Sequence, residues 1–187
     1  MAIITKAIVK SFLRIPTAET GDDSLIDEMI GDLEAFAKTV CNRVFESAEV
    51  TQYYDGDGTK NLLVNYYPIT AVSALYDDTD RVYGADTAID SGDYIIKEDE
   101  GKIVLDEGLI FAEGVKNIKI TYTGGYSAGT MPADLKHAIK LLVCAKYLEG
   151  QGEINAIKGD GYAVEDRTTR WRKEAMGILQ LYKRFSL

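Results

Sequence analysis

The chain has 187 residues, of which 46% are hydrophobic and 27% are charged, which is typical of a soluble globular protein with one domain and room for an appendage. Its net charge of −9 argues against a protein that binds nucleic acid by neutralising phosphates. The sequence has no run of about 18 apolar residues and no signal-peptide pattern at its start, so we expect no membrane span.

Two helices are predicted in the N-terminal region. The shorter covers residues 6–13, with Ala7, Ile8 and Phe12 as its packing face. The longer begins at residues 21–24, where aspartate and serine side chains offer N-cap oxygens. Apolar residues at helical spacing then form a stripe over about four turns, namely Leu25, Ile26, Met29, Ile30, Leu33, Phe36, Ala37 and Val40.

From Phe45 the hydrophobic pattern changes to period two, which is typical of strands. Strands are predicted at residues 49–54, 62–66, 69–76, 93–96, 102–105 and 117–123. The Asp-Gly-Asp-Gly stretch at residues 55–58 predicts a hairpin between the first two of them. Residues 77–92 are polar and are expected to form an exposed excursion. Helices on both sides of a block of short antiparallel strands indicate an α+β fold.

The most apolar helix of the chain is predicted after the last strand. Gly124 and Gly125 end that strand, because glycine adopts left-handed backbone angles at little cost. Pro132 suits the first position of the helix that follows. The centre of this helix, residues 141–145, is apolar on every side, so it must be covered on more than one side.

A glycine-containing linker and a final helix complete the chain, which predicts domain boundaries at residues 1–149 and 150–187. The final helix has a narrow apolar seam with the spacing of a coiled coil. The seam consists of Trp171, Ala175, Ile178, Tyr182 and Phe185, and it is flanked by Arg170, Arg172, Lys173 and Lys183. Two interpretations remain open, because this helix could dock on a partner or fold back to complete the core of its own chain.

The two ends of the chain differ in charge. Residues 158–187 contain seven basic and four acidic side chains and carry a net charge of +3, which leaves −12 on residues 1–157. A basic tail on an acidic body favours the interpretation in which the final helix docks on a partner.

The sequence from Gly125 to Gly129 matches G-x-S-x-G, the nucleophile elbow of serine hydrolases, with Ser127 as the nucleophile. In an elbow the helix begins directly after the serine, whereas here it begins only at Pro132. The single histidine, His137, lies on that helix and is poorly placed to reach back to Ser127. We therefore interpret Ser127 as a turn residue and keep a small serine hydrolase as the alternative.

Other functional patterns are incomplete. Cys41 and Cys144 lie on apolar helix faces and are expected to be buried free thiols. A lone histidine gives no zinc site, and residues 55–66 lack the glycine and the glutamate of a calcium loop. The sequence therefore predicts no catalytic residues, no metal site and no cofactor.

Characteristic residues follow the predicted elements in order over about residues 5–148. They are Phe12-Leu13-Arg14-Ile15, Asp22-Asp23, Leu25-Ile26, Cys41-Asn42-Arg43, Tyr54-Asp55-Gly56-Asp57-Gly58, Pro68-Ile69, Asp93-Tyr94, Gly101-Lys102-Ile103, residues 120–126 and residues 131–139. In this ordered set the chain resembles the head–tail connector (head-completion, or adaptor) proteins of tailed bacteriophages.

The resemblance implies a structural virion protein at the phage neck, assembled in the host cytoplasm. It implies a homo-oligomeric ring of about twelve copies that binds the portal after DNA packaging, completes the head and connects it to the tail or to the next neck (stopper) protein. Genomic DNA would pass through the ring without specific binding, which suits an acidic body. A generic protein-binding module is a further alternative.

The resemblance implies that the C-terminal segment reaches the portal and that helices pack side by side around the ring. The charge and the apolar seam of the final helix then predict portal docking for Arg170, Trp171, Arg172, Lys173, Ile178, Tyr182 and Phe185. Packing between subunits is predicted for the apolar helix, through Leu141, Leu142, Val143, Ala145 and Tyr147.

Overall fold

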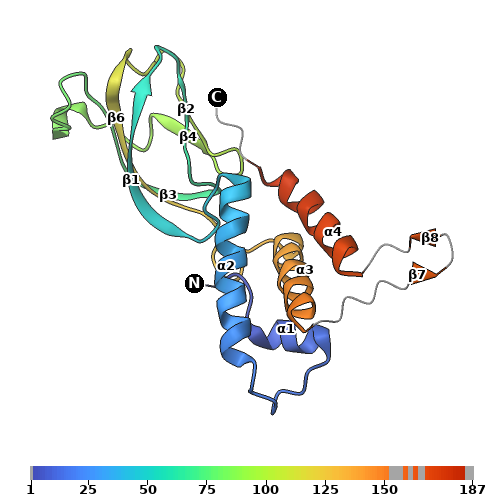
Figure 1. The fold of residues 1–187 in the computed structure, drawn as a ribbon. Helices are drawn as coiled ribbons and strands as arrows, with labels where there is room; N and C mark the ends of the chain where they lie inside the picture. The colour runs from blue at the N-terminus through green and yellow to red at the C-terminus, as the bar shows by residue number, and fades with distance from the viewer. Residues whose placement is uncertain (1, 152–157, 160–161, 164–166, 184–187) are drawn as a thin grey trace. The chain divides into compact units, whose positions relative to one another are not determined.

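The computed structural model describes residues 2–151, 158–159, 162–163 and 167–183. It divides into two units, each visible in Figure 1. The helical unit is formed from residues 1–43 and 130–187, and the strand unit is Val44–Gly129. The predicted α+β fold, a helical bundle with an inserted block of strands, is confirmed. The predicted boundary at residue 149 differs from this division, because the last helix belongs to the helical unit.

The elements follow one another in a simple order. The helical unit contains α1 (Lys6–Leu13), α2 (Asp23–Cys41), α3 (Ala133–Gly150) and α4 (Arg167–Leu181), with the short strands β7 (Lys158–Gly159) and β8 (Tyr162–Ala163) between the last two helices. The strand unit contains β1 (Ala48–Gly56), β2 (Asn61–Leu63), β3 (Ile69–Asp77), the 3-10 helix η1 (Ala85–Thr87), β4 (Tyr94–Lys97), β5 (Lys102–Leu105) and β6 (Gly114–Gly124). Among the described residues, we find no helix with the length and apolarity to cross a membrane.

α1 has the predicted bounds but a different packing face. Ala7 and Ile8 are exposed, whereas Val9 and Lys10 are buried, so the predicted face is wrong. The Lys10 ammonium explains the rotation, because it lies 2.8 Å from the Asp23 carboxylate and also donates to the carbonyl oxygen of Glu19. A lysine can be buried when its charge is paired and its protons are bonded in this way.

Only part of the predicted apolar stripe of α2 is buried. Ile26, Ile30 and Ala37 are buried, but Leu25 and Phe36 are 41% and 43% exposed. The buried side also contains Glu34, whose Oε1 accepts hydrogen bonds from the backbone N–H groups of Ile3 and Ile4 at 2.5 and 3.2 Å. α2 therefore anchors the start of the chain and leaves one apolar flank open.

α3 is the central helix of its unit. It packs against α1, α2 and α4, which covers it on several sides. The segment predicted to be apolar all round is buried within the chain, with Leu141 2% exposed and Val143 and Ala145 fully buried. The prediction that such a helix needs cover on more than one side is confirmed.

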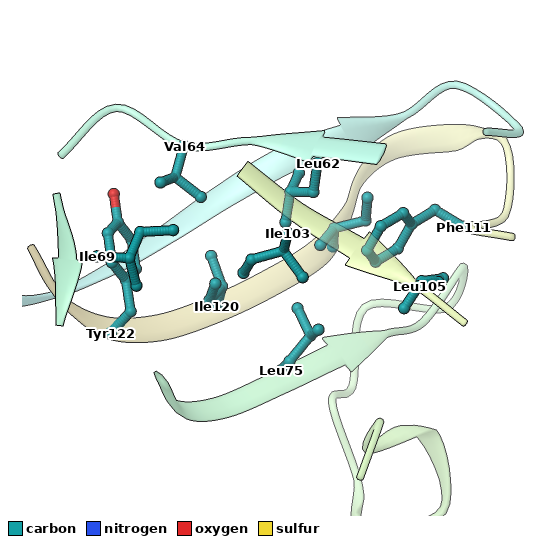
Figure 2. Close-up of a cluster of buried hydrophobic side chains, with 10 residues drawn as sticks. Leu62, Val64, Ile69, Leu75, Ile103, Leu105, Phe111, Ile120 and Tyr122 are labelled. Carbon is teal, nitrogen blue, oxygen red and sulfur yellow. The ribbon is translucent and has the colours of Figure 1, made fainter. Parts of the chain in front are cut away.

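The strand unit consists of two three-stranded antiparallel sheets, ordered β1-β6-β3 and β2-β5-β4. Figure 2 shows the apolar side chains that form its core. The buried residues of this core are Leu62, Val64, Ile69, Leu75, Ile103, Leu105, Phe111, Ile118, Ile120 and Tyr122. β4 and β5 pair with each other as an antiparallel hairpin. The hairpin predicted between the first two strands is wrong, because β1 pairs with β6 and β2 pairs with β5.

A buried amide closes one end of this unit. Asn117 Oδ1 accepts a hydrogen bond from the N–H of Gly56 at 2.9 Å, and Nδ2 donates to Asp77 Oδ1 at 2.8 Å and to the carbonyl oxygen of Ala112 at 2.9 Å. Gly56 must be glycine, since a Cβ there would lie 1.8 Å from the Ala112 oxygen. One side chain thus ties three segments together.

The polar excursion after β3 is folded onto its sheet. The Asp78 carboxylate accepts hydrogen bonds from the N–H groups of Asp80, Val82 and Tyr83. The ring of Tyr83 then lies 5.5 Å from that of Tyr53, between ring centroids. Val82 remains 79% exposed at the tip of the excursion.

Candidate functional site

The G-x-S-x-G segment has the geometry of a turn. Gly125 has a φ of +96°, and a Cβ there would lie 2.6 Å from the carbonyl oxygen of Glu46, so the corner requires glycine. Ser127 is exposed, and α3 begins only at Ala133. His137 Nε2 lies 3.1 Å from Glu174 Oε1 on α4. Ser127 therefore lacks the helix start that builds an oxyanion hole.

The two cysteines are buried thiols. Burial raises the pKa of Cys144 to about 12, and it also raises the pKa of Cys41. A thiol with a raised pKa holds little thiolate, which is the reactive form, at neutral pH. Within the described ranges, histidine, cysteine and acidic side chains do not gather into a group of three that could hold a metal ion.

α4 folds back on its own chain. It packs against α3, and its residues Ala175 and Leu179 are fully buried. The Cys41 thiol of α2 lies 3.3 Å from the carbonyl oxygen of Leu179. Of the two open interpretations of this helix, the structure shows the one in which it completes the helical core.

The predicted seam of α4 is only partly the buried one. Its buried residues are Thr168, Ala175 and Leu179, while Trp171, Ile178 and Tyr182 are half-buried. Phe185 lies outside the described residues. The buried side of α4 differs from the predicted seam because it is the side that faces both α2 and α3.

Several of the predicted docking residues on α4 form polar contacts with residues of α3. Tyr182 donates a hydrogen bond to Asp134 Oδ1 at 2.6 Å, and Arg172 forms an ion pair with Glu149. With the pair of His137 and Glu174, these contacts extend over most of the length of α4. Arg172 and Tyr182 therefore act within the chain in this structure.

A hollow of about 800 Å³ opens in the helical unit where α1, α3 and α4 meet. Aromatic and cationic side chains form one part of its lining, where the rings of Phe12 and Trp171 lie 5.2 Å apart and the Arg167 guanidinium lies 5.0 Å from the Trp171 ring. Its full lining is Phe12, Leu13, Arg14, Ile15, Glu19, Asp22, Tyr147, Leu148, Gln151, Arg167 and Trp171.

The other part of the lining is a fixed hydrogen-bond network. Asp22 Oδ2 accepts from the Tyr147 hydroxyl at 2.6 Å and from Gln151 Nε2 at 3.3 Å. The bond to Asp22 raises the pKa of Tyr147, so this hydroxyl stays a proton donor at neutral pH. The hollow thus has a cationic aromatic side and an acidic side whose carboxylate is already bonded.

The predicted contact residues do not gather at one place. Trp171 lines the hollow, and Arg170 and Lys173 are exposed on α4. The five residues predicted for subunit packing are buried by neighbouring helices of the same chain, so their apolar character no longer argues for a subunit contact. Phe12, Arg14 and Arg167 were not predicted for the site. The sequence signal was the Phe-Leu-Arg-Ile end of the first helix, whose pairing with Trp171 depends on the tertiary fold.

Comparison with solved structures shows where this fold recurs. A chain described as "Neck of empty GTA particle computed with C6 symmetry" matches with a TM-score of 0.64 and 17% identity, over 99% of this chain and 91% of that chain. A chain of the "Neck of native GTA particle computed with C12 symmetry" matches with a TM-score of 0.59 and 17% identity, over 100% and 94%. A chain of the "Virion of native gene transfer agent (GTA) particle" matches with a TM-score of 0.57 and 16% identity, over 89% and 80%.

The family comparison covers nearly the whole chain. No curated protein matches the sequence. The model of a family described as "Head completion protein" matches residues 2–185, which include both units. This family consists of structural phage proteins and not of enzymes, which excludes the hydrolase alternative. The chain therefore belongs to the head completion protein family.

Proposed function

We propose that the protein is a structural component of the neck of a tailed phage or phage-like particle. The observation that carries this proposal is the family match over residues 2–185. The similar fold of chains in the necks of gene transfer agent particles supports it. In this role the protein is part of the virion and is assembled in the host cytoplasm.

The protein works as a homo-oligomeric ring of about twelve copies. After DNA packaging the ring binds the portal, completes the head and offers a platform to the tail or to the next neck protein. A net charge of −12 over residues 1–157 suits a channel through which DNA slides, because like charges keep the phosphates from binding. Symmetries of C6 and C12 in the similar necks support a ring.

The portal contact lies at the hollow of the helical unit. Trp171 presents a large aromatic surface beside the Arg167 guanidinium, and the Lys140 ammonium lies 4.6 Å from the Phe12 ring centroid. Aromatic and arginine side chains of this kind are the usual anchors of protein interfaces. The partner segment would place an apolar side chain on the rings and a carboxylate near Arg14 and Arg167.

Deletion of the gene tests the main proposal. Producer cells without the protein should still make heads and package DNA, but the heads should lack tails and lose their DNA. Electron microscopy and nuclease protection of packaged DNA measure both effects. Tailed, infectious particles from the deletion strain, or the protein found only as an unattached monomer in lysates, contradict the proposal.

Charge reversal at the hollow tests the portal contact separately. The double variant Arg14→Glu, Arg167→Glu should reduce capture of the full-length chain by DNA-filled heads, because it removes two cations from the contact. Lys60→Glu, an exposed lysine of the strand unit, is the matched control and should be captured normally. Equal capture of all three chains contradicts docking at the hollow and leaves the neck role standing.

A further inference from the structure

Two helices of the helical unit each leave one face uncovered. α2 and α4 both pack against α3, and each turns its opposite side away from it. On α2 the uncovered face combines two large apolar side chains with two carboxylates, from Leu25, Glu28, Asp32 and Phe36. We call this the acidic α2 face. On α4 the uncovered face consists of Arg170, Lys173, Gly177 and Leu181, which we call the basic α4 face.

The two faces are complementary in spacing. In each, the second, third and fourth residues follow the first by three, seven and eleven positions, the spacing of one side of an α-helix. Leu25 and Phe36 are 41% and 43% exposed, and Leu181 is 81% exposed. On α2 the apolar side chains lie at both ends of about three turns, and on α4 Leu181 lies at one end of a face of the same length, so the two faces match in length for helix packing.

The two faces are also complementary in charge. Glu28 and Asp32 are exposed and form no ion pair within the described part of the chain. Arg170 is likewise exposed and has no acidic partner among the described residues. Two acids on one face and two cations on the other favour the pairing of unlike faces and disfavour the pairing of like faces.

Gly177 is a third, independent observation. It lies inside α4, where glycine is less favourable than alanine. A Cβ at this position would meet nothing within 4 Å, so packing inside the chain does not require glycine. Gly31 on α2 has the same open surroundings, but Gly177 lies on the basic α4 face, where the missing side chain leaves room for a helix of another chain.

We infer that the ring contact joins the acidic α2 face of one copy to the basic α4 face of the next. Because the two faces differ, the contact is heterologous, which is the kind of contact that repeats from subunit to subunit around a ring. The inference rests on the proposed ring and names its surfaces. The subunit contact was predicted at the centre of α3, which is buried. The inference places it on the outer sides of α2 and α4 instead.

Cysteine cross-linking in assembled particles tests this arrangement. A chain that carries both Phe36→Cys and Leu181→Cys, or both Leu25→Cys and Leu181→Cys, should give a ladder of oligomers on a non-reducing gel after mild oxidation. Each single variant should stay monomeric, since a heterologous contact does not bring identical positions together. A ladder from the pair at positions 36 and 181 indicates that the two helices run parallel, and a ladder from the pair at positions 25 and 181 indicates that they run antiparallel. The native Cys41 and Cys144 are buried and do not contribute.

The outcomes separate this inference from the proposed function. Particles that contain the protein but give no ladder with either pair overturn the inference and leave the neck role intact. Dimers from a single variant overturn it as well, because they indicate that identical faces meet. Particles from which the wild-type chain is absent overturn the proposed function, and the inference with it.

A pair of glycine variants provides a second test that does not depend on cross-linking. Gly177→Ala should raise the Tm of the full-length chain by about 2–4 °C and yet lower its incorporation into particles. Gly31→Ala on α2 is the matched control, because a Cβ there also meets nothing within 4 Å and Gly31 is outside the acidic α2 face. It should raise the Tm without changing incorporation. Equal incorporation of both variants contradicts close packing at Gly177.

Discussion

The helical unit and the strand unit satisfy their polar and apolar groups in different ways. The strand unit is one continuous stretch, Val44–Gly129, and its ten buried core residues come from both of its sheets (Figure 2). The helical unit joins two segments that are separated by this whole stretch. Its core is completed by α4, and on the outer face of α2 exposed apolar side chains lie at helical spacing beside carboxylates that are unpaired among the described residues. The strand unit also exposes apolar side chains, among them Val82, Ile110 and Val115, but these lie on separate loops and strand ends.

This difference indicates a division of work between the two units. A unit built from one continuous stretch contains every segment of its own core, so its core does not depend on distant parts of the chain. A unit built from distant segments depends on the contacts that join them, and its uncovered faces are available to other chains. We therefore expect substitutions in the strand core to change stability, and substitutions on the outer helical faces to change assembly.

Removal of α4 should have the largest effect on the helical unit. Deleting Thr168–Leu187 removes the fully buried Ala175 and Leu179 and uncovers α3, which should cost more than about 4 kcal/mol of stability. Limited proteolysis with mass spectrometry should then show cleavage in residues 1–43 and 130–167 while the strand unit survives. A truncated chain as resistant as the full one would mean that α4 is only a docking segment.

Asn117→Ala should have the next largest effect and should reverse the pattern. It removes three hydrogen bonds, those of Asn117 with the N–H of Gly56, Asp77 Oδ1 and the carbonyl oxygen of Ala112, at a cost of about 3 kcal/mol. Hydrogen exchange should quicken in β1 and β6. Trp171, the single tryptophan, lies in the helical unit, so its urea-induced fluorescence change should keep its midpoint.

Asn61→Ala is the matched control for this variant. Asn61 is exposed at the start of β2, and no hydrogen bond of its side chain is present among the described residues. Its loss should change stability by less than about 0.5 kcal/mol. If Asn117→Ala behaves in the same way, the buried amide does not hold the end of the strand unit.

The sequence predicted elements better than it predicted their partners. The bounds of α1, the start of α2 and the strands β4 and β5 were predicted from local patterns. The expected N-cap hydrogen bond of α2 is absent, because Asp22 accepts from Tyr147 and Gln151 instead. The pairing of β1 with β6 joins residues about 70 positions apart, and no local signal encodes it. The buried Lys10 escaped prediction for the same reason, because its partner Asp23 lies on the next helix.

For the functional surfaces, too, the sequence predicted the character of the elements better than their neighbours in the fold. The family could be identified from the ordered residues, and the absence of an elbow helix after Ser127 follows from the position of Pro132. The basic and apolar character of α4 was evident, but the buried side was not, since Leu179 falls outside the predicted seam. Which face of an amphipathic helix is covered depends on its neighbours, and these are set by tertiary packing.

Tyr147→Phe should have a moderate effect that is confined to the helical unit. It removes the hydroxyl that donates to Asp22 Oδ2 at 2.6 Å, which should lower stability by about 1 kcal/mol. Trp171 fluorescence during urea unfolding measures the shift. A midpoint equal to that of the wild-type chain would show that the link between Asp22 and α3 contributes nothing.

Asp78→Asn should have the smallest effect, visible only as a change in pH dependence. The N–H of Tyr83, more than those of Asp80 and Val82, holds the pKa of Asp78 below its usual value, while burial partly opposes this. A carboxylate with a lowered pKa stabilises the fold above its unfolded pKa of about 4, and this contribution is lost as the pH falls through its folded pKa.

In the wild-type chain, hydrogen exchange in residues 78–88 should therefore quicken at acid pH beyond its intrinsic pH dependence. Asp78→Asn keeps an oxygen acceptor but has no charge to lose, so it should remove this extra pH dependence. Asp80→Asn should behave as wild type, because it is the backbone N–H of Asp80 that bonds to Asp78. Identical pH profiles for all three chains would show that the Asp78 charge does not hold the excursion. The excursion would then be held in place by its uncharged contacts with the rest of the strand unit.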